Sequence, residues 1–302
     1  MVDILMATYN GELFVEAQVR SIMNQSFEDW RLLIHDDGST DQTLVILRRL
    51  QEEDSRVVLI EDGISRLGVA LNFIHLMQYS SAPFSMYCDQ DDIWLPTKVE
   101  EMVGAIQEYD QTIPQVVYSN AYLWNQNQGI LSDKNTLTYP TTLRQMLFLN
   151  TGIQGAAAIF NRRLCELMRQ KLDFYAMHDH ALLLTAICFG EVHYLHKPLM
   201  YYRQHENNVT GNAPGSIRKK IQLMWQNRHV PLVSFEHYQG LKAFYRHFAS
   251  EISLPDRLLI DEFLQMREKS FFSRVWSIIY WRFQLFDSTM LLIIKLCIRR
   301  YI

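Results

Sequence analysis

The sequence predicts an α/β fold, in which a mostly parallel sheet is flanked by helices and followed by a helical C-terminal extension. Two observations favour this fold. In the first half of the chain, short and mainly apolar segments alternate with segments whose apolar residues recur at helical spacing. Beyond residue 216 the pattern becomes helical throughout, and residues 256–302 contain neither glycine nor proline.

The elements are expected in the following order along the chain. The strands cover residues 3–7, 31–35, 57–60, 84–88, 116–121 and 155–160, with extended segments over 192–203. The helices cover residues 12–24, 41–53, 69–78 and 180–188, and two more begin near Pro96 and after Asn161, since proline suits a first helical turn and asparagine is a typical N-cap. Residues 207–216, rich in Asn, Gly and Pro, are the expected linker between a catalytic domain over 1–212 and a helical extension over 213–302.

Charge is distributed unevenly between these two parts. Residues 1–214 hold 15 Lys and Arg against 26 Asp and Glu, whereas residues 215–302 hold 14 against 7. The hydrophobic fraction of 48% excludes a disordered chain, and the four scattered cysteines disfavour a disulfide framework or a structural zinc site. No secretory signal and no membrane-spanning stretch is recognisable, so we expect a cytoplasmic protein.

Acidic residues follow two of the expected strands, where open parallel sheets bind ligands. Asp89-Gln90-Asp91-Asp92 suits a hard cation such as Mg²⁺ or Mn²⁺, because these ions prefer oxygen ligands. If the segment stays extended, Asp89 and Asp91 share one side. The alternative is a solvated turn, in which Asp91 or Asp92 complements the dipole of the next helix.

The second acidic segment covers residues 36–41 and reads Asp-Asp-Gly-Ser-Thr-Asp. A carboxylate here would contact the base or ribose of a nucleotide, as strand-end acids do in dinucleotide-binding folds. The alternative is a turn that Ser39 or Thr40 caps, and both can hold at once. The chain has no G-x-G-x-x-G and no P-loop motif, which disfavours nicotinamide dehydrogenases and P-loop enzymes.

Four segments together resemble family 2 glycosyltransferases of the GT-A fold. They are Ala7-Thr8-Tyr9-Asn10-Gly11, Ser21-Ile22-Met23-Asn24-Gln25-Ser26, Asp36-Asp37-Gly38-Ser39-Thr40-Asp41 and Asp89-Gln90-Asp91-Asp92-Ile93-Trp94. Together with Tyr202-Arg203-Gln204-His205, the last of them is similar to bacterial rhamnosyltransferases of cell-wall or surface polysaccharide synthesis. The resemblance covers about residues 1–210. It implies a GT-A type, Rossmann-like sheet.

The resemblance also implies a donor site at the ends of the strands. The residues expected to bind the nucleotide-sugar are Ala7, Thr8, Tyr9, Asn10, Asp36, Asp37, Gly68, Asn72, Asp89, Gln90, Asp92 and Arg203. The metal, Mg²⁺ or Mn²⁺, is expected on Asp89 and Asp91, with His205 as a further ligand. The family often carries an asparagine before Gly68. This chain has Arg66 two residues before it, which would reach a phosphate instead.

Asp179 is the candidate general base, because the resemblance implies an acid at the start of a helix for this role. The structural alternative is a helix N-terminal charge, whose dipole would also keep the carboxylate ionised. The expected acceptor or sugar pocket comprises Trp94, Gly152, Gly155, His178 and His180. For Trp94 a place in the core is equally expected, and the glycines also suit a loop packed under a helix.

The last 32 residues of the sequence, 271–302, combine basic residues with aromatic and aliphatic ones. If residues 271–302 form one helix, Arg274, Arg282, Lys295, Arg299 and Arg300 fall within one arc, opposite aromatic and aliphatic residues. Such a helix fits the interface of a membrane, while packing on the catalytic domain or a homo-oligomer contact fits equally well. Nucleic acid is disfavoured, because only one face is cationic and the front of the chain is acidic.

The sequence therefore predicts an inverting, metal-dependent glycosyltransferase at the inner face of the cell membrane. It would move rhamnose from dTDP-rhamnose onto a lipid-linked glycan. The alternative is a catalytically silent homologue that scaffolds a membrane-bound assembly complex. A nucleotidyltransferase is disfavoured, because the loop after the first strand, residues 8–11, has no basic residue.

Overall fold

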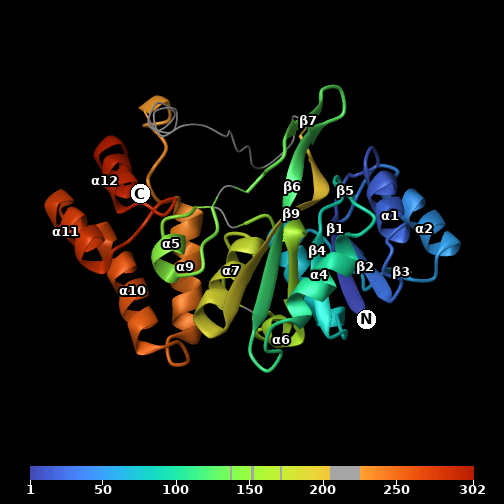
Figure 1. Ribbon diagram of the computed structural model, residues 1–302, viewed down its shortest axis with the longest axis horizontal. Helices are drawn as coiled ribbons and strands as arrows, with labels where there is room; N and C mark the ends of the chain where they lie inside the picture. Colours follow the sequence, from blue (N-terminus) through green and yellow to red (C-terminus); the bar gives the residue numbers. More distant parts are fainter. Residues whose placement is uncertain (137, 151–152, 171, 205–224) are drawn as a thin grey trace. The chain divides into compact units, whose positions relative to one another are not determined.

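The computed structural model describes residues 1–136, 138–150, 153–170, 172–204 and 225–302 (Figure 1). Contacts divide the chain into two compact units. Unit 1 comprises residues 1–136, 153–171 and 190–211, and unit 2 comprises residues 137–152, 172–189 and 212–302. The expected domains over 1–212 and 213–302 stay a prediction. The contact units differ from them, because residues 137–152 and 172–189 group with the C-terminal helices.

Unit 1 is built on a nine-stranded sheet with the order β3-β2-β1-β4-β8-β6-β9-β5, and β7 pairs with β6. Its strands are β1 (Val2–Thr8), β2 (Trp30–Asp36), β3 (Val57–Leu59), β4 (Phe84–Cys88), β5 (Ile93–Trp94), β6 (Gln115–Asn125), β7 (Gly129–Ser132), β8 (Ala158–Asn161) and β9 (Glu191–Arg203). The first four are mutually parallel, as predicted. β8 lies antiparallel between β4 and β6, so the sheet is mixed beyond β4.

Two layers of helices cover this sheet. The helices of unit 1 are α1 (Val15–Met23), α2 (Thr43–Glu53), α3 (Val69–Leu76, extended by a 3-10 turn at Met77–Tyr79), α4 (Lys98–Gln107) and α6 (Arg162–Met168). Apolar side chains of α1, α2 and α4 pack on one face of the strands. α3 packs on the opposite face, where Phe73 meets Tyr87 of β4. The predicted N-cap is confirmed, because the Asn161 side chain accepts a hydrogen bond from Leu164 N–H.

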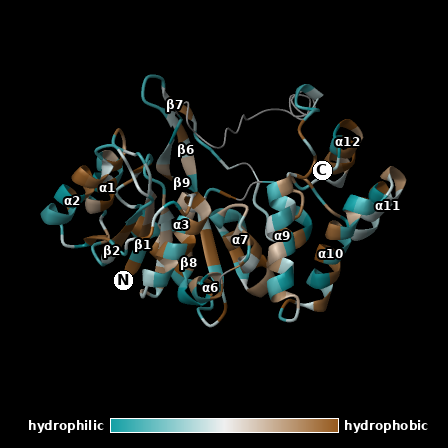
Figure 2. Ribbon diagram, turned by 180° about the vertical axis from the view of Figure 1, so that it is seen from behind, coloured by the Kyte–Doolittle hydropathy of each residue, from teal (hydrophilic) through white to brown (hydrophobic). Residues whose placement is uncertain are grey.

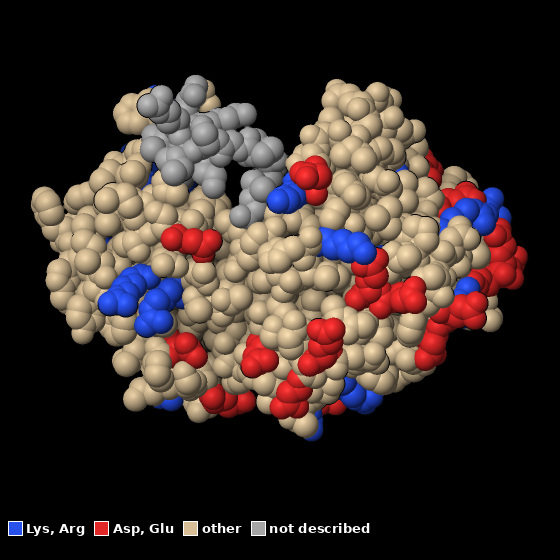
Figure 3. All heavy atoms as spheres, in the orientation of Figure 1, with Lys and Arg blue, Asp and Glu red and all other residues tan. Residues whose placement is uncertain are grey.

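Charged side chains of unit 1 are partly paired on its surface. Figure 3 shows red and blue side chains side by side at the edge that α1 and α2 occupy in Figure 1. Arg20 bridges Glu16 and Glu53 across these two helices, and Arg49 also pairs with Glu16. Part of the acidic charge of the front half is therefore neutralised by ion pairs away from the strand ends.

Unit 2 is helical in the residues that the structure describes. It contains α5 (Leu143–Met146), α7 (His178–Phe189), α9 (Phe235–Phe248), α10 (Leu254–Gln265, with a 3-10 turn at Met266–Glu268), α11 (Phe271–Trp281) and α12 (Thr289–Ile298). α7 is mostly buried and appears largely brown in Figure 2. Among the described helices, none has the length and hydropathy needed to cross a membrane. The expected linker, 207–216, lies outside the described residues.

The prediction of one helix over 271–302 is wrong. α11 ends at Trp281, and the next residue, Arg282, adopts a left-handed conformation with φ 55°. Phe286 and Asp287 also have positive φ before α12 begins. The expected basic arc does not form. Arg274 donates to the carbonyls of Met266 and Arg267, while Lys295 is buried within α12.

A close backbone approach makes Gly190 sensitive to substitution. Its missing side chain leaves room for the carbonyl of Pro114, which Glu191 N–H binds at 3.0 Å. We expect Gly190→Ala to lower the free energy of unfolding by about 1–3 kcal/mol, because a Cβ would overlap that carbonyl. Gly104→Ala is the matched control. It lies in α4 with open space around it, so it should raise stability by about 0.5–1 kcal/mol. Urea unfolding measures both, and equal effects would contradict the prediction.

Candidate active site

The loops after β1 and β2 interlock through side-chain hydrogen bonds. The carboxylate of Asp36 accepts from the Thr8 hydroxyl at 2.9 Å and from the N–H and hydroxyl of Ser39 at 2.7 and 2.6 Å. Asn10, with φ 47°, donates its N–H to the Ser39 hydroxyl and accepts from Thr40 N–H. Asp36 therefore shapes this turn. The expected cap by Ser39 or Thr40 is wrong, because α2 begins at Thr43, whose N–H donates to the Asp41 carboxylate at 3.0 Å. Ala7 and Thr8 end β1 and the following Tyr9 is exposed; contact of this segment with a nucleotide stays a prediction.

Asp37 holds the loop between β3 and α3. Its two carboxylate oxygens accept from the N–H groups of Leu67 at 2.7 Å and Gly68 at 2.8 Å. Gly68 has φ 74° and precedes α3, a conformation that favours glycine. Asn72, predicted to contact the nucleotide, is buried and bonds with His35 instead. Asn72 thus supports the loop from inside, because its amide is used within the fold.

Gln90 ties the loop after β4 to the loop after β1. Its amide accepts from Tyr9 N–H at 2.9 Å and donates to Tyr9 C=O at 3.0 Å, as a paired strand would. Gly11 lies directly against this amide, so a Cβ at residue 11 would collide with it. Gln90 therefore positions the two loops, a role that its place between aspartates did not reveal.

The acidic segment after β4 turns at Gln90 and Asp91 and does not stay extended, so the expected alternation of Asp89 and Asp91 does not apply. Asp89 and Asp91 are half-buried, and Asp92 is fully buried. Burial raises the pKa of Asp92 well above its usual value, and the negative charges of Asp91 and Asp89 raise it further. Among the described residues, the hydrogen bonds to the Asp92 carboxylate come from Arg203 N–H at 3.1 Å and the Gln154 amide at 3.4 Å.

These residues fit a hard divalent cation. Asp89, Asp91 and Asp92 follow one strand end, and the negative charges of Asp91 and Asp89 add to burial in raising the pKa of Asp92. Carboxylate oxygens are also the ligands that Mg²⁺ and Mn²⁺ prefer. His205, predicted as a further ligand, lies outside the described residues.

Arg203 closes the site from β9. Its Nε donates to the carbonyl oxygen of Asp91 at 2.7 Å, and its guanidinium lies over the rings of Phe14 and Trp124. The side chain is buried, so it holds the acidic loop by its backbone. Contact between Arg203 and a diphosphate stays a prediction.

Trp94 and Gly155 occupy the core beneath this loop. Trp94 is 2% exposed, which favours the structural alternative over stacking on a sugar. Lys98, fully buried, lies over its ring at 3.9 Å and donates to Ala156 C=O at 2.6 Å. Burial lowers the pKa of Lys98 to about 7. No motif in the sequence pointed to Lys98, although it stands at a buried position of α4. Gly155 begins a buried 3-10 turn, and Gly152 lies outside the described residues.

Asp179 lies in unit 2, in the first turn of α7, as the sequence predicts. Its carboxylate accepts from His180 N–H at 2.6 Å. Burial raises the pKa of Asp179 to about 6, although backbone hydrogen bonds oppose the shift. Burial thus opposes the expected effect of the helix dipole, which would keep this carboxylate ionised. A carboxylate with this pKa is suited to accept a proton near neutral pH.

The neighbouring histidines point into the helical core. His178 and His180 are 4% and 3% exposed, and burial lowers the pKa of His178 to about 3. The ring of His180 packs edge-on against His237 of α9 at 4.5 Å. This burial favours a structural role for both. Their contact with an acceptor stays a prediction.

The sheet and its acidic strand end define a glycosyltransferase of the GT-A fold. The model of glycosyl transferase family 2 matches residues 3–168, more than half of the chain, and the chain belongs to this family. The predicted family and fold class are thereby confirmed.

Two curated relatives are equally similar in sequence. The Escherichia coli UDP-Glc:alpha-D-GlcNAc-diphosphoundecaprenol beta-1,3-glucosyltransferase WfgD is 28% identical over 77% of this chain and 88% of its own length. The Shigella flexneri dTDP-rhamnosyl transferase RfbG is also 28% identical, over 68% of this chain and 73% of its own.

Solved structures resemble the chain in fold. TarS 1-349 of S. aureus, in complex with UDP-GlcNAc, has a TM-score of 0.55 at 16% identity, over 87% of this chain and 80% of the TarS 1-349 chain. The Pyrobaculum calidifontis mannosyltransferase PcManGT, in complex with GDP-Man and Mn²⁺, has a TM-score of 0.52 at 15% identity, over 97% of this chain and 85% of its own.

Proposed function

We propose that the protein is an inverting, metal-dependent glycosyltransferase that moves rhamnose from dTDP-rhamnose onto a lipid-linked glycan in bacterial surface polysaccharide synthesis. The observation that carries this proposal is the cluster of Asp89, Asp91 and Asp92 at the end of β4 in a family 2 glycosyltransferase. The rhamnosyl relative and the similarity of residues 89–94 to rhamnosyltransferases support the donor. The diphosphoundecaprenol in the name of the glucosyl relative supports the acceptor.

The chain's own residues would perform the following steps. Asp36 and Asp37 hold the nucleotide-facing loops in place, and Gln90 fixes their spacing to the acidic segment. A divalent cation on Asp89 and Asp91 would stabilise the charge of the leaving diphosphate. The carboxylate of Asp179 takes the proton of the acceptor hydroxyl. The acceptor oxygen bonds to the anomeric carbon on the face opposite the diphosphate. The bond between that carbon and the diphosphate oxygen breaks, and its electron pair leaves with the diphosphate.

A panel of nucleotide-sugars tests this proposal. Purified protein is mixed with undecaprenyl-diphosphate-linked acceptor in vesicles, with Mn²⁺ or with EDTA, and each donor is offered in turn. We expect transfer from dTDP-rhamnose that EDTA abolishes. Transfer from UDP-glucose alone would overturn the donor, because the glucosyl relative is equally similar. Absence of transfer from every donor would favour the catalytically silent scaffold.

We propose that α11 brings the enzyme to the membrane through an aromatic face, in place of the expected basic arc. Phe272, Trp276, Ile279 and Tyr280 follow helical spacing and are 82%, 60%, 56% and 63% exposed. Trp and Tyr favour the membrane–water interface. Residues 266–302 hold seven Lys and Arg against two Asp and Glu. Lys295 is buried and Arg274 binds backbone carbonyls, so the remaining basic excess is what complements anionic lipids. An apolar helix face within a basic segment therefore fits an anionic bilayer.

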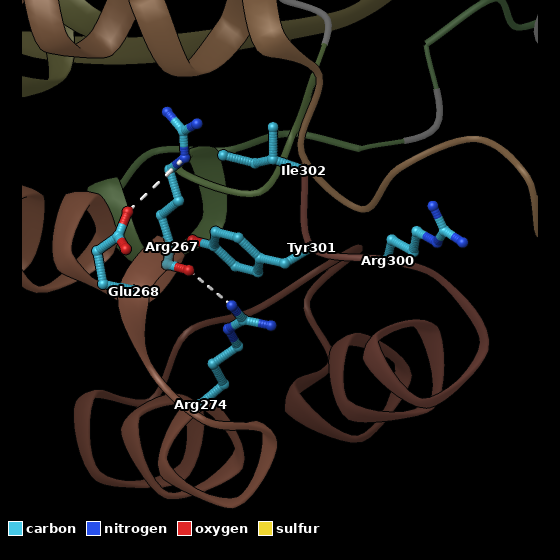
Figure 4. Close-up of a pocket in the computed structure, with 6 residues that line it drawn as sticks. All are labelled: Arg267, Glu268, Arg274, Arg300, Tyr301 and Ile302. Carbon is cyan, nitrogen blue, oxygen red and sulfur yellow. Dashed lines mark hydrogen bonds and ion pairs between the residues drawn. The ribbon is translucent and has the colours of Figure 1, made fainter.

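The pocket beside this helix does not add a built anion site. It has a volume of about 480 Å³ and is lined by Arg267, Glu268, Arg274, Arg300, Tyr301 and Ile302 (Figure 4). Arg267 pairs with Glu268, and Arg274 donates to the carbonyl of Arg267. Figure 4 shows Arg267 and Arg300 pointing apart, so their guanidinium groups do not converge on one ligand. The membrane proposal therefore rests on the aromatic face of α11.

We expect the double substitution Phe272→Ser and Trp276→Ser to weaken binding to anionic vesicles by about tenfold or more, because it removes two exposed aromatic side chains from one face. Co-sedimentation with vesicles measures the effect. Val45→Ser in α2, which replaces an equally exposed apolar residue, is the control. Unchanged vesicle binding, with a change of oligomeric state, would instead assign the face to a partner subunit.

A further inference from the structure

Three side chains with metal-binding chemistry meet in unit 1, away from the acidic segment after β4. His35 lies on β2, Asp62 in the loop that follows β3, and His75 on α3. His75 Nε2 is 2.6 Å from Asp62 Oδ2, and His35 Nε2 is 3.4 Å from Asp62 Oδ1. Their ligand atoms all lie within 4.8 Å of one another. The donor set is therefore two imidazole nitrogens and one carboxylate.

The hydrogen bonds of Asn72 determine which nitrogen of His35 carries the proton. The Asn72 amide nitrogen donates to the backbone carbonyl of His35 at 3.2 Å, which leaves its oxygen facing His35 Nδ1 at 2.6 Å. An amide oxygen only accepts, so Nδ1 is protonated. In the neutral ring, the lone pair of Nε2 then faces the carboxylate of Asp62. Two acceptors that face each other are satisfied by a proton on Nε2 or by a metal ion bound between them.

Two other groups orient the carboxylate of Asp62. The Tyr79 hydroxyl donates to Oδ2 at 2.7 Å, and Ile64 N–H donates to Oδ1 at 2.9 Å. These two hydrogen bonds hold the carboxylate in place beside the histidines, as the partners of a metal ligand do.

We propose that His35, Asp62 and His75 bind a divalent transition-metal ion of the Zn²⁺ class. Two imidazoles and one carboxylate suit such an ion, with a fourth position left for water. Asn72 accepts the other ring proton of His35, which is the arrangement that orients histidine ligands. The side chains of Asp62 and His75 are 19% and 18% exposed, so the ion has a path from solvent.

The bound ion would fasten the loop before α3 beneath the nucleotide-binding edge. Asp37 already holds the far end of this loop through Leu67 and Gly68. The proposed ion would fix the near end at Asp62 and tie it to β2 and α3. Its role is therefore structural support of the donor site, separate from the cation expected on Asp89 and Asp91.

Metal binding is tested with the full chain carrying Asp89→Asn and Asp91→Asn, so that the acidic segment after β4 does not hold the ion. The protein is stripped with a chelator and titrated with Co²⁺ and Zn²⁺. We expect one ion per chain, a visible Co²⁺ spectrum of nitrogen and oxygen ligands, and a Zn²⁺-dependent rise in the unfolding temperature. His75→Ala and Asp62→Asn, added singly, should each weaken binding by about tenfold or more.

The variants are placed at His75 and Asp62 because His35 is buried, and its replacement could unfold the protein. The control is His229→Ala, which removes an exposed histidine in unit 2. The proposal would be overturned if the chain with Asp89→Asn and Asp91→Asn bound Zn²⁺ with the same affinity before and after His75→Ala is added. It would also be overturned if that chain bound no ion at all, because the cation between His35 and Asp62 would then be a proton.

Discussion

We expect Asp179→Asn to lower the rate constant of transfer by about 10²–10⁴-fold, because an amide cannot take the proton of the acceptor hydroxyl. Donor affinity should stay within about twofold, since Asp179 would act on the acceptor and the donor-site loops are held by other residues. Steady-state kinetics separate kcat from the donor KM. Asp173→Asn, at an exposed aspartate of the same unit, is the control and should retain full activity.

The pH profile adds a second readout for Asp179. Burial raises the pKa of this carboxylate to about 6, so the enzyme should lose activity as pH falls through about 6 and the base is protonated. Wild-type kcat measured from pH 5 to 8 should show this acidic limb, with the metal held saturating. Full transferase activity of Asp179→Asn would remove this residue from the mechanism.

The stability of the same variant separates loss of chemistry from misfolding. A carboxyl group whose folded pKa is raised contributes stability below its unfolded pKa, and that contribution is lost as pH rises through the folded value. Above about pH 6 the ionised Asp179 is therefore a destabilising group. We expect the neutral Asp179→Asn variant to unfold at the same temperature or higher at pH 8. A lower unfolding temperature there would attribute its inactivity to structure.

Local patterns were sufficient to predict the elements that depend on them. The parallel strands β1 to β4 read as buried apolar runs, and the Asn161 cap follows from its side chain. The break after α11 left no such signal, because Arg282 takes a left-handed conformation that usually indicates glycine. The antiparallel place of β8 depends on pairing with β4 and β6, which no local pattern encodes.

For the candidate site, too, local sequence patterns predict positions but not the contacts of each side chain. The strand-end positions of Asp36, Asp37, Asp89 and Asp91 follow from the order of the strands. The use of each side chain depends on neighbours far along the chain. Asp37 binds the backbone of a loop 30 residues later, and Gln90 pairs with a residue 81 positions earlier. Trp94 and Lys98 are buried together in the core. The residues that flank Trp94 in the sequence suit a buried tryptophan and an exposed, sugar-binding tryptophan equally well.

We expect Asp91→Asn to lower the rate of metal-dependent transfer by about 10²-fold or more. A cation at this cluster supplies several kcal/mol of charge stabilisation to the departing diphosphate, and an amide holds it far less well than a carboxylate. The half-buried Asp91 also takes part in the repulsion that raises the pKa of Asp92, so the neutral variant has less need of a cation. Isothermal titration of the donor with Mn²⁺ should show correspondingly weaker binding.

Asp110→Asn is the matched control for Asp91. Asp110 is an exposed aspartate just before β6, at the edge of the sheet where the parallel strands begin. Removing its charge should leave both transfer and Mn²⁺-dependent donor binding unchanged, which separates a local metal effect from a general loss of negative charge. Transfer by Asp91→Asn at the wild-type rate, with the same Mn²⁺ dependence, would show that the cation is not held by Asp91.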